Sequence, residues 1–257
     1  YRPSDFSPDK SYSVVSHVLN NSGIQFVAKS AFNGHGYSSM LPAMALAELG
    51  FIVVQFDGRG TPARGKAFQD HSYGWNNGPT TSDLSDHVEG IRQLAKRYPY
   101  MDLDRVGIVT EMVGPSAVWG LLNYPDFYKV GVEGAVIDDR ANGAWVSEMF
   151  NGPDGAGHHR QYPEQLVDKL KGKLLLPLSS GTYGNPFPSQ IRLAGAFAAA
   201  NKDINISFDA GYAWYTTTYQ IRQGWDYLVR HLQHNTPPVN FKLDGTALWD
   251  TGVLSAA

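Results

Sequence analysis

Short apolar runs alternate with segments of helical spacing along almost the whole chain. The runs that fit strands cover residues 12–19, 51–56, 106–109, 130–137, 173–178 and 204–208. The segments that fit helices cover residues 40–49, 81–98, 116–122, 163–170, 189–202 and 216–234. Such alternation is typical of βαβ units, in which helices join parallel strands. The 257 residues contain no linker or repeat. We therefore predict one α/β domain over residues 1–257, with a mainly parallel central sheet and helices on both faces.

The charge and composition exclude several classes of protein. A net charge of −3 argues against a nucleic-acid binder, which normally carries a basic excess. No apolar run approaches the roughly 18 residues that cross a bilayer, so we expect no membrane span. The chain has no cysteine, which excludes disulfides and thiol catalysis. The pairs His158–His159 and His231/His234 lack a third ligand at convincing spacing, so we expect neither a metal site nor a cofactor.

The stretch from Asp104 to Trp119 has the layout of a nucleophile elbow. An apolar run at residues 106–109 leads into an abrupt turn and then into a helix-like segment. In α/β-hydrolases this layout carries the pattern G-x-S-x-G, because glycines must flank a strained turn that lifts the serine out of the sheet. The turn here reads Thr110-Glu111-Met112-Val113-Gly114. Ser116 does not complete the pattern, since Val118 stands where the second glycine should be. The sequence therefore predicts an elbow without its serine.

Six stretches make this chain resemble a known family. They are residues 1–6 (YRPSDF), 32–37 (FNGHGY), 49–61 (LGFIVVQFDGRGT), 98–108 (YPYMDLDRVGI), 124–131 (YPDFYKVG) and 225–232 (WDYLVRHL). In these stretches the sequence resembles the catalytic domain of the prolyl oligopeptidase family, in its dipeptidyl peptidase IV-like branch. The resemblance implies an α/β-hydrolase fold. It also implies a preceding β-propeller, which we expect to be absent here, and it leaves a homodimer open.

The position of the family's nucleophile does not hold a serine. Counting forward from residues 106–108 places that position at Met112. Counting back from residues 124–127 places it at Glu111. On either alignment we expect no conventional serine peptidase.

The other catalytic positions of the family are also changed. By the resemblance, Tyr183 stands where the family has its aspartate, and Tyr212 stands where it has its histidine. The family's oxyanion-hole tyrosine corresponds to Leu19. Because the unperturbed pKa of tyrosine is about 10, Tyr212 cannot replace histidine as a proton shuttle near neutral pH.

The replacing side chains are mostly apolar or aromatic, which predicts a pocket for a hydrophobic or planar small molecule. The residues that we expect to line it are Leu19, Trp119, Trp145, Phe187 and Trp214. The first hypothesis is therefore a pseudo-peptidase that keeps the fold and binds such a molecule, or a partner, in the former cleft. In another interpretation the same side chains fill a disused cleft as core.

Two alternatives retain catalysis. In the first, a repurposed cyclase, isomerase or lyase uses Glu111 as its acid or base, and Tyr183 or Tyr212 donates a hydrogen bond to a developing oxyanion. Glu111 could instead be solvated or paired with Arg140. In the second, a residual serine peptidase or esterase uses another nucleophile. The compartment stays open, and the alternatives for this soluble chain include secretion and the periplasm.

Overall fold

A computed structural model describes residues 1–18, 25–27, 29, 41–73, 83–110, 116–134, 162–179, 187–209 and 217–243. Within these residues, one sheet has the strand order β2-β1-β3-β4-β5-β6. The strands are β1 (Tyr12–Val18), β2 (Ile52–Val54), β3 (Met101–Thr110), β4 (Tyr128–Val132), β5 (Lys173–Ser179) and β6 (Asn205–Asp209). Every neighbouring pair is parallel, which confirms the predicted parallel sheet.

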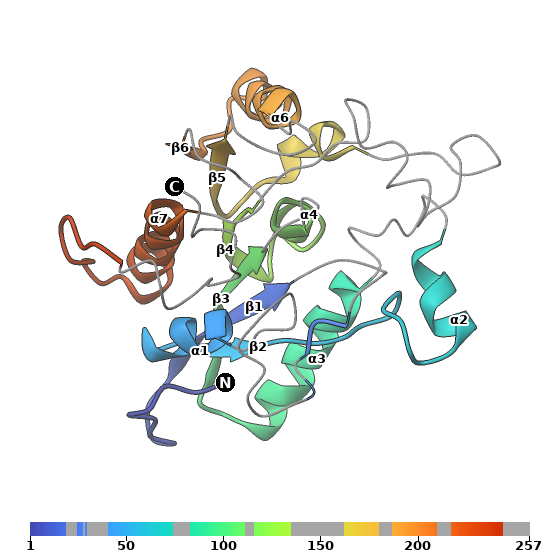
Figure 1. Ribbon diagram of the computed structural model, residues 1–257, viewed down its shortest axis with the longest axis vertical. Helices are drawn as coiled ribbons and strands as arrows, with labels where there is room; N and C mark the ends of the chain where they lie inside the picture. Colours follow the sequence, from blue (N-terminus) through green and yellow to red (C-terminus); the bar gives the residue numbers. More distant parts are fainter. Residues whose placement is uncertain are drawn as a thin grey trace, which may run out of the picture.

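Helices cover both faces of this sheet (Figure 1). The main ones are α1 (Leu41–Glu48), α3 (Leu84–Arg97), α4 (Ser116–Asn123), α6 (Phe187–Ala199) and α7 (Thr218–Leu228). Successive side chains of a strand point to opposite faces. Val14 accordingly joins the core that α3, α4 and α6 cover, whereas Val15 joins the core under α1 and α7. The prediction of helices on both faces is confirmed.

Helix α4 lies deep in the first of these cores. All of its residues from Ser116 to Leu122 are buried. Gly120 permits the close approach to the sheet, because an added Cβ would lie 2.8 Å from Cδ1 of Ile108. Core packing therefore fixes the helix that follows the predicted elbow.

Some predicted elements differ from those observed. The predicted helix at residues 163–170 is two 3₁₀ helices, η3 (Pro163–Gln165) and η4 (Val167–Lys169). The predicted helix at residues 216–234 is α-helical only as far as Leu228, and then becomes the π-helix η5 (Val229–Gln233). These differences concern hydrogen-bond spacing, to which apolar periodicity is insensitive.

The predicted helix at residues 81–98 begins later than expected. Helix α3 starts at Leu84, with Asp83 at its N-cap and no capping hydrogen bond from that side chain. Residues 81 and 82, the first two of the predicted helix, lie outside the described residues. The Asp83 carboxylate lies near His87 instead.

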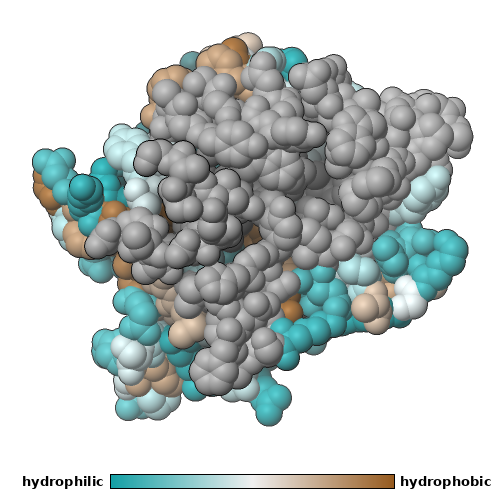
Figure 2. Space-filling model, viewed as in Figure 1, coloured by the Kyte–Doolittle hydropathy of each residue, from teal (hydrophilic) through white to brown (hydrophobic). Residues whose placement is uncertain are grey.

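Two short helices, α2 (Lys66–Gln69) and η1 (Asp70–Ser72), follow the loop after β2. On the face shown in Figure 2, hydrophilic and hydrophobic residues are interspersed over most of the coloured surface. Hydrophobic residues gather at the top of the view, over α6. Ile191 of α6 is exposed. The strand β6 at the end of the sheet also exposes Ile206 and Phe208.

Candidate functional site

The carboxyl ends of the parallel strands share one edge of the sheet, which is where open α/β sheets bind ligands. Leu19 directly follows β1 in the chain, and Glu111 and Met112 directly follow β3. Tyr183 and Tyr212 come shortly after the ends of β5 and β6. The chain therefore leaves the sheet at this edge before each of these positions. All of them lie outside the described residues, as do Arg140, Trp145 and Trp214.

The flanks of the predicted elbow are well defined. Strand β3 ends at Thr110 and helix α4 begins at Ser116, so five residues join them. These residues, 111–115, include no serine, threonine or cysteine. The two flanking hydroxyls are enclosed, because Thr110 is 3% exposed and Ser116 is 0% exposed. Neither can meet a substrate from solvent in this structure.

Glu133 lies directly after β4, and its carboxyl group binds the first turn of α4, which is one flank of the elbow. Oε2 of Glu133 accepts a hydrogen bond from the Val118 N–H at 2.9 Å. Oε1 accepts one from the Gly134 N–H at 3.0 Å. One buried side chain thus bonds the end of β4 to the first turn of α4.

The environment of Glu133 favours its neutral form. Burial raises the pKa of Glu133 to about 8, and the hydrogen bonds from the Val118 and Gly134 N–H groups lower it only in part. The first N–H groups of a helix ordinarily offer a place for a negative charge. Here the Val118 N–H is already bound by a side chain of the protein itself.

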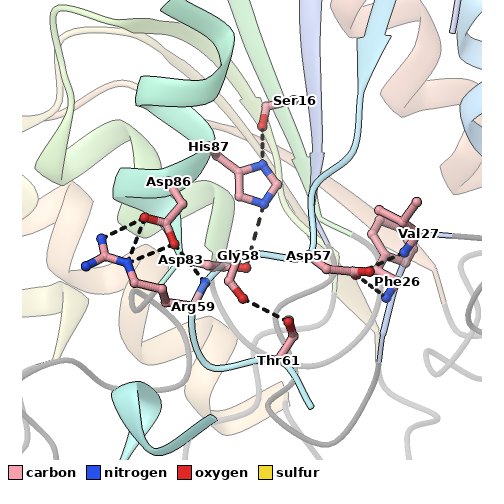
Figure 3. Close-up of polar contacts among 10 residues, drawn as sticks. All are labelled: Ser16, Phe26, Val27, Asp57, Gly58, Arg59, Thr61, Asp83, Asp86 and His87. Atoms are coloured by element: carbon pink, nitrogen blue, oxygen red, sulfur yellow. Dashed lines mark hydrogen bonds and ion pairs between the residues drawn. The ribbon is translucent and has the colours of Figure 1, made fainter. Parts of the chain in front are cut away.

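A chain of Ser, His and Asp side chains lies in the core beside α3 (Figure 3). The Ser16 hydroxyl lies 3.1 Å from Nδ1 of His87, and Nε2 of His87 lies 3.6 Å from Oδ2 of Asp83. The order resembles that of a catalytic triad. All three residues are buried, with Ser16 and His87 at most 1% exposed. The arrangement therefore holds β1 against α3 and cannot attack a substrate.

Two side chains of the loop after β2, Asp57 and Thr61, form hydrogen bonds with backbone groups. Oδ1 of Asp57 accepts hydrogen bonds from the N–H groups of Phe26 at 2.6 Å and Val27 at 3.0 Å (Figure 3). The Thr61 hydroxyl donates to the Gly58 carbonyl oxygen at 2.8 Å. Asp57 thereby joins residues 26 and 27 to the start of the loop after β2.

Arg59, in the same loop, binds the first turns of α3. Its Nε and Nη2 donate to both carboxylate oxygens of Asp86, and its backbone N–H donates to Oδ2 at 2.7 Å. Partial burial disfavours the charged form of Asp86, but the hydrogen bonds from Arg59 outweigh it and lower the pKa of Asp86. This guanidinium group is therefore engaged within the protein.

Two of the predicted pocket residues are described. Trp119 is 4% exposed and belongs to the core under α3, α4 and α6. Phe187 is half-buried, packs against the same core, and has its ring centroid 6.4 Å from that of Phe208. A contact of either residue with a ligand stays a prediction.

The sequence reasoning did not single out Glu133, Ser16 or His87. Each gives only a weak signal in the sequence, because it is a polar residue whose neighbours in the strand or on the helix face are mostly apolar. Ser16 interrupts the apolar run of β1, and Glu133 follows that of β4. A buried polar residue needs a partner, but the partner of Ser16 is far along the chain.

The described residues contain no group of three or more His, Cys, Asp or Glu side chains that could hold a metal ion. In the same part of the chain, no helix has both the length and the apolar character required to cross a membrane.

Comparison with known proteins agrees with this fold. The profile of the prolyl oligopeptidase family matches residues 37–171, slightly more than half of the chain. Dipeptidyl peptidase 8 from Homo sapiens is 33% identical over 138 residues, which are 53% of this chain and 15% of that protein.

Two solved structures share the whole arrangement. Dipeptidyl peptidase 4 from Porphyromonas gingivalis has a TM-score of 0.74 at 20% identity, covering 90% of this chain and 33% of its own. Acylaminoacyl peptidase from Pyrococcus horikoshii has a TM-score of 0.71 at 17% identity, covering 94% of this chain and 40% of its own. The predicted α/β-hydrolase fold is confirmed. The chain spans well under half of each relative.

Proposed function

The chain belongs to the prolyl oligopeptidase family, and we propose that it is a non-hydrolytic member of it. In this proposal, the carboxyl edge of the sheet no longer cleaves peptides. It binds a hydrophobic or aromatic small molecule, or an apolar group of a partner.

The composition of residues 111–115 carries this proposal. A serine hydrolase of this fold presents its nucleophile in the turn between strand and helix. None of the five residues between Thr110 and Ser116 has a hydroxyl or thiol group. The hydroxyls of Thr110 and Ser116 are buried, and so is the Ser16 hydroxyl beside His87. These observations support the loss of serine chemistry.

The residues after the other strands support the choice of ligand. Tyr183 and Tyr212 follow β5 and β6, and Trp214 comes two positions after Tyr212. Aromatic rings offer flat apolar surface with a polar edge, which suits a planar ligand.

A fluorophosphonate probe, which reacts with activated serines, tests the loss of hydrolysis. We expect no more labelling of the native protein than of the heat-denatured protein, with an active serine peptidase of the family as the positive control. Stoichiometric labelling of one serine, located by peptide mass spectrometry, would overturn the proposal.

Nile red, an uncharged aromatic dye that fluoresces in apolar sites, tests the binding function. We expect saturable binding that weakens in Tyr183→Ala and Tyr212→Ala. Tyr73→Ala is the control for an exposed tyrosine that is not an expected pocket residue, because Tyr73 is 55% exposed and follows η1. Binding that is equally strong in all variants would contradict a site at this edge.

The position of Glu111 keeps a catalytic alternative in view. It is the first residue after β3, so it offers a carboxylate for acid–base chemistry at the strand ends. The variant Glu111→Gln separates the two functions once a ligand is identified. Turnover by the wild type that is lost in Glu111→Gln, with binding retained, would establish an enzyme. Binding by both proteins without turnover supports the proposed binder.

A further inference from the structure

We propose that a basic cluster at the amino edge of the sheet, where its strands begin, is a binding site for a phosphate-type oxyanion. The cluster consists of Lys173, Arg230, His231 and His234. Lys173 is the first residue of β5, and the other three belong to η5 and its C-cap. The cluster lies at the opposite edge of the sheet from the strand ends that bear the proposed function, so it does not depend on that function.

Contacts with several strands fix η5 at the amino edge. The Tyr227 hydroxyl donates to Oδ1 of Asn205, the first residue of β6, at 3.0 Å. The Tyr227 ring packs on the ring of His231, with the two centroids 4.4 Å apart. The hydroxyl of Ser13, near the start of β1, donates to the Leu232 carbonyl oxygen at 3.2 Å. The end of this helix therefore lies where the strands begin.

The side chain of Lys173 lies on the same face of the sheet as η5. Leu174 packs in the core under α3, α4 and α6, whereas Leu175 packs with Leu232 in the core under α1 and α7. Because successive side chains of a strand point to opposite faces, Lys173 shares the face of Leu175. Lys173 is exposed. A lysine from the sheet thus joins the basic residues from the helix.

Acidic side chains do not balance the cluster. None of its four members forms an ion pair with a carboxylate in the part of the chain that the structure describes. The one carboxylate of α7, Asp226, is paired with Arg222 at 2.9 Å and is attracted to Arg230 only at longer range. The positive charge of the cluster is therefore left without a partner of its own.

The electrostatic surroundings of His231 are positive. Burial lowers the pKa of His231, and the charges of the other three members of the cluster lower it further. Every charged group that acts on this ring is therefore basic. Like charges that gather in this way repel one another, and a bound anion relieves the repulsion.

The donor groups of the cluster suit a phosphate-type oxyanion. A guanidinium group presents paired N–H donors that match two oxygens of a phosphate, and a lysine ammonium group adds a compact positive charge. Each neutral imidazole also offers one N–H donor. A dianion neutralises the two fixed cations, Lys173 and Arg230, whereas a single carboxylate would neutralise only one.

Basic residues near the end of a helix also have a structural role, because they complement the helix dipole. This role accounts for Arg230 and His231, which lie in the last turn of η5. It does not account for Lys173, which begins a strand. The two roles are distinguishable by experiment, since a dipole interaction needs no ligand.

Titration with sodium pyrophosphate at constant ionic strength and near neutral pH tests the site. We expect the NMR signals of the His231 ring to shift and to saturate. The signals of His71, which lies in η1 outside the cluster, should stay unchanged. A His231 signal that does not shift, or a shift that sodium chloride reproduces at the same ionic strength, would overturn the proposal.

Two variants and two matched controls locate the binding. Lys173→Ala and Arg230→Ala should each weaken pyrophosphate binding about tenfold, because each removes a charged hydrogen-bond donor. The control Lys171→Ala removes a lysine that is paired with Asp126 at 2.8 Å. The control Arg97→Ala removes a basic residue from the last turn of α3. All four substituted side chains are exposed, so we expect each variant to fold. Unchanged binding in Lys173→Ala and Arg230→Ala, or equal weakening in the controls, would contradict a site at this cluster.

Discussion

The hydroxyl of Ser16 lies 3.1 Å from Nδ1 of His87, although the two residues are 71 positions apart in the chain. Ser16 is on β1, which pairs with both β2 and β3, and His87 is on α3, which covers that part of the sheet. Both side chains are enclosed in the core. The bond therefore fastens the middle of the sheet to its covering helix through polar groups that have no access to water.

Removing the Ser16 hydroxyl should destabilise the protein. In Ser16→Ala, Nδ1 of His87 is left in the core without this partner, which typically costs about 1–3 kcal/mol. Chemical denaturation should show a lower midpoint with an unchanged slope. Ser11→Ala is the matched control, because Ser11 is exposed and precedes the same strand. Equal midpoints for the two variants would show that the bond contributes no stability.

The sheet and its helices could be predicted from the sequence because each depends on local periodicity. The runs that became β1, β4 and β5 are apolar over several residues, and the glycine after α1 marks its end. Gly50 indeed has φ of 90°, in the left-handed region that favours glycine. Such signals need no knowledge of distant residues.

The contacts of Ser16 and Glu133 could not be predicted in the same way. They join residues from different elements, so they depend on the register in which the sheet and its helices assemble. Asp83 shows the difficulty. It stands at the N-cap of α3, where an aspartate ordinarily caps the helix, but its side chain makes no capping hydrogen bond and lies 3.6 Å from His87, one helical turn later. A local pattern cannot decide between these partners.

Gly58 should not tolerate a side chain. A Cβ added there would lie 2.5 Å from Cβ of Asp83, and both atoms belong to well-packed parts of the structure. We expect Gly58→Ala to cost about 1–3 kcal/mol through overpacking. Gly195→Ala, in the middle of α6, has nothing within 4 Å of the added Cβ. It should instead gain about 0.5–1 kcal/mol from helix propensity. Thermal unfolding distinguishes the two, and a Gly58→Ala protein as stable as the wild type would contradict the predicted clash.

The pair Arg59–Asp86 should stabilise the protein only above acidic pH. Hydrogen bonds from Arg59 lower the pKa of Asp86, so its contribution is present above the unfolded pKa of about 3.9 and is lost as the pH falls below it. The side chains are 45% and 27% exposed. Screening by solvent should therefore limit the coupling to about 1 kcal/mol or less. A double-mutant cycle with Arg59→Ala and Asp86→Ala should measure this coupling near neutral pH. The coupling free energy should become smaller in high salt. A coupling free energy that neither salt nor acid changes would contradict an ion pair between Arg59 and Asp86.

Glu133 should impose the opposite pH dependence on stability. Its pKa rises on folding from 4.5 to about 8, so the folded state holds a proton that the unfolded state has released. Between these values, stability should fall as the pH rises, with a limiting slope of about 1.4 kcal/mol per pH unit. Glu133→Gln should remove this slope, and Glu89→Gln should keep it. Unfolding in urea at several pH values measures the effect, and parallel profiles for the wild type and Glu133→Gln would refute it.

The outer edge of β6 is the face to test for the homodimer that the family resemblance leaves open. It ends the sheet, and no strand pairs with its far side in the part of the chain that the structure describes. Ile206 and Phe208 point to solvent there, at 51% and 57% exposed, and the neighbouring α6 exposes Ile191. An edge strand with apolar side chains readily pairs with a second copy.

We expect sedimentation equilibrium to show a dimer that dissociates in Phe208→Lys. The control Tyr73→Lys, which changes an exposed residue after η1, should leave the dimer intact. A wild-type protein that stays monomeric at high concentration, or a dimer that survives Phe208→Lys, would remove β6 from consideration.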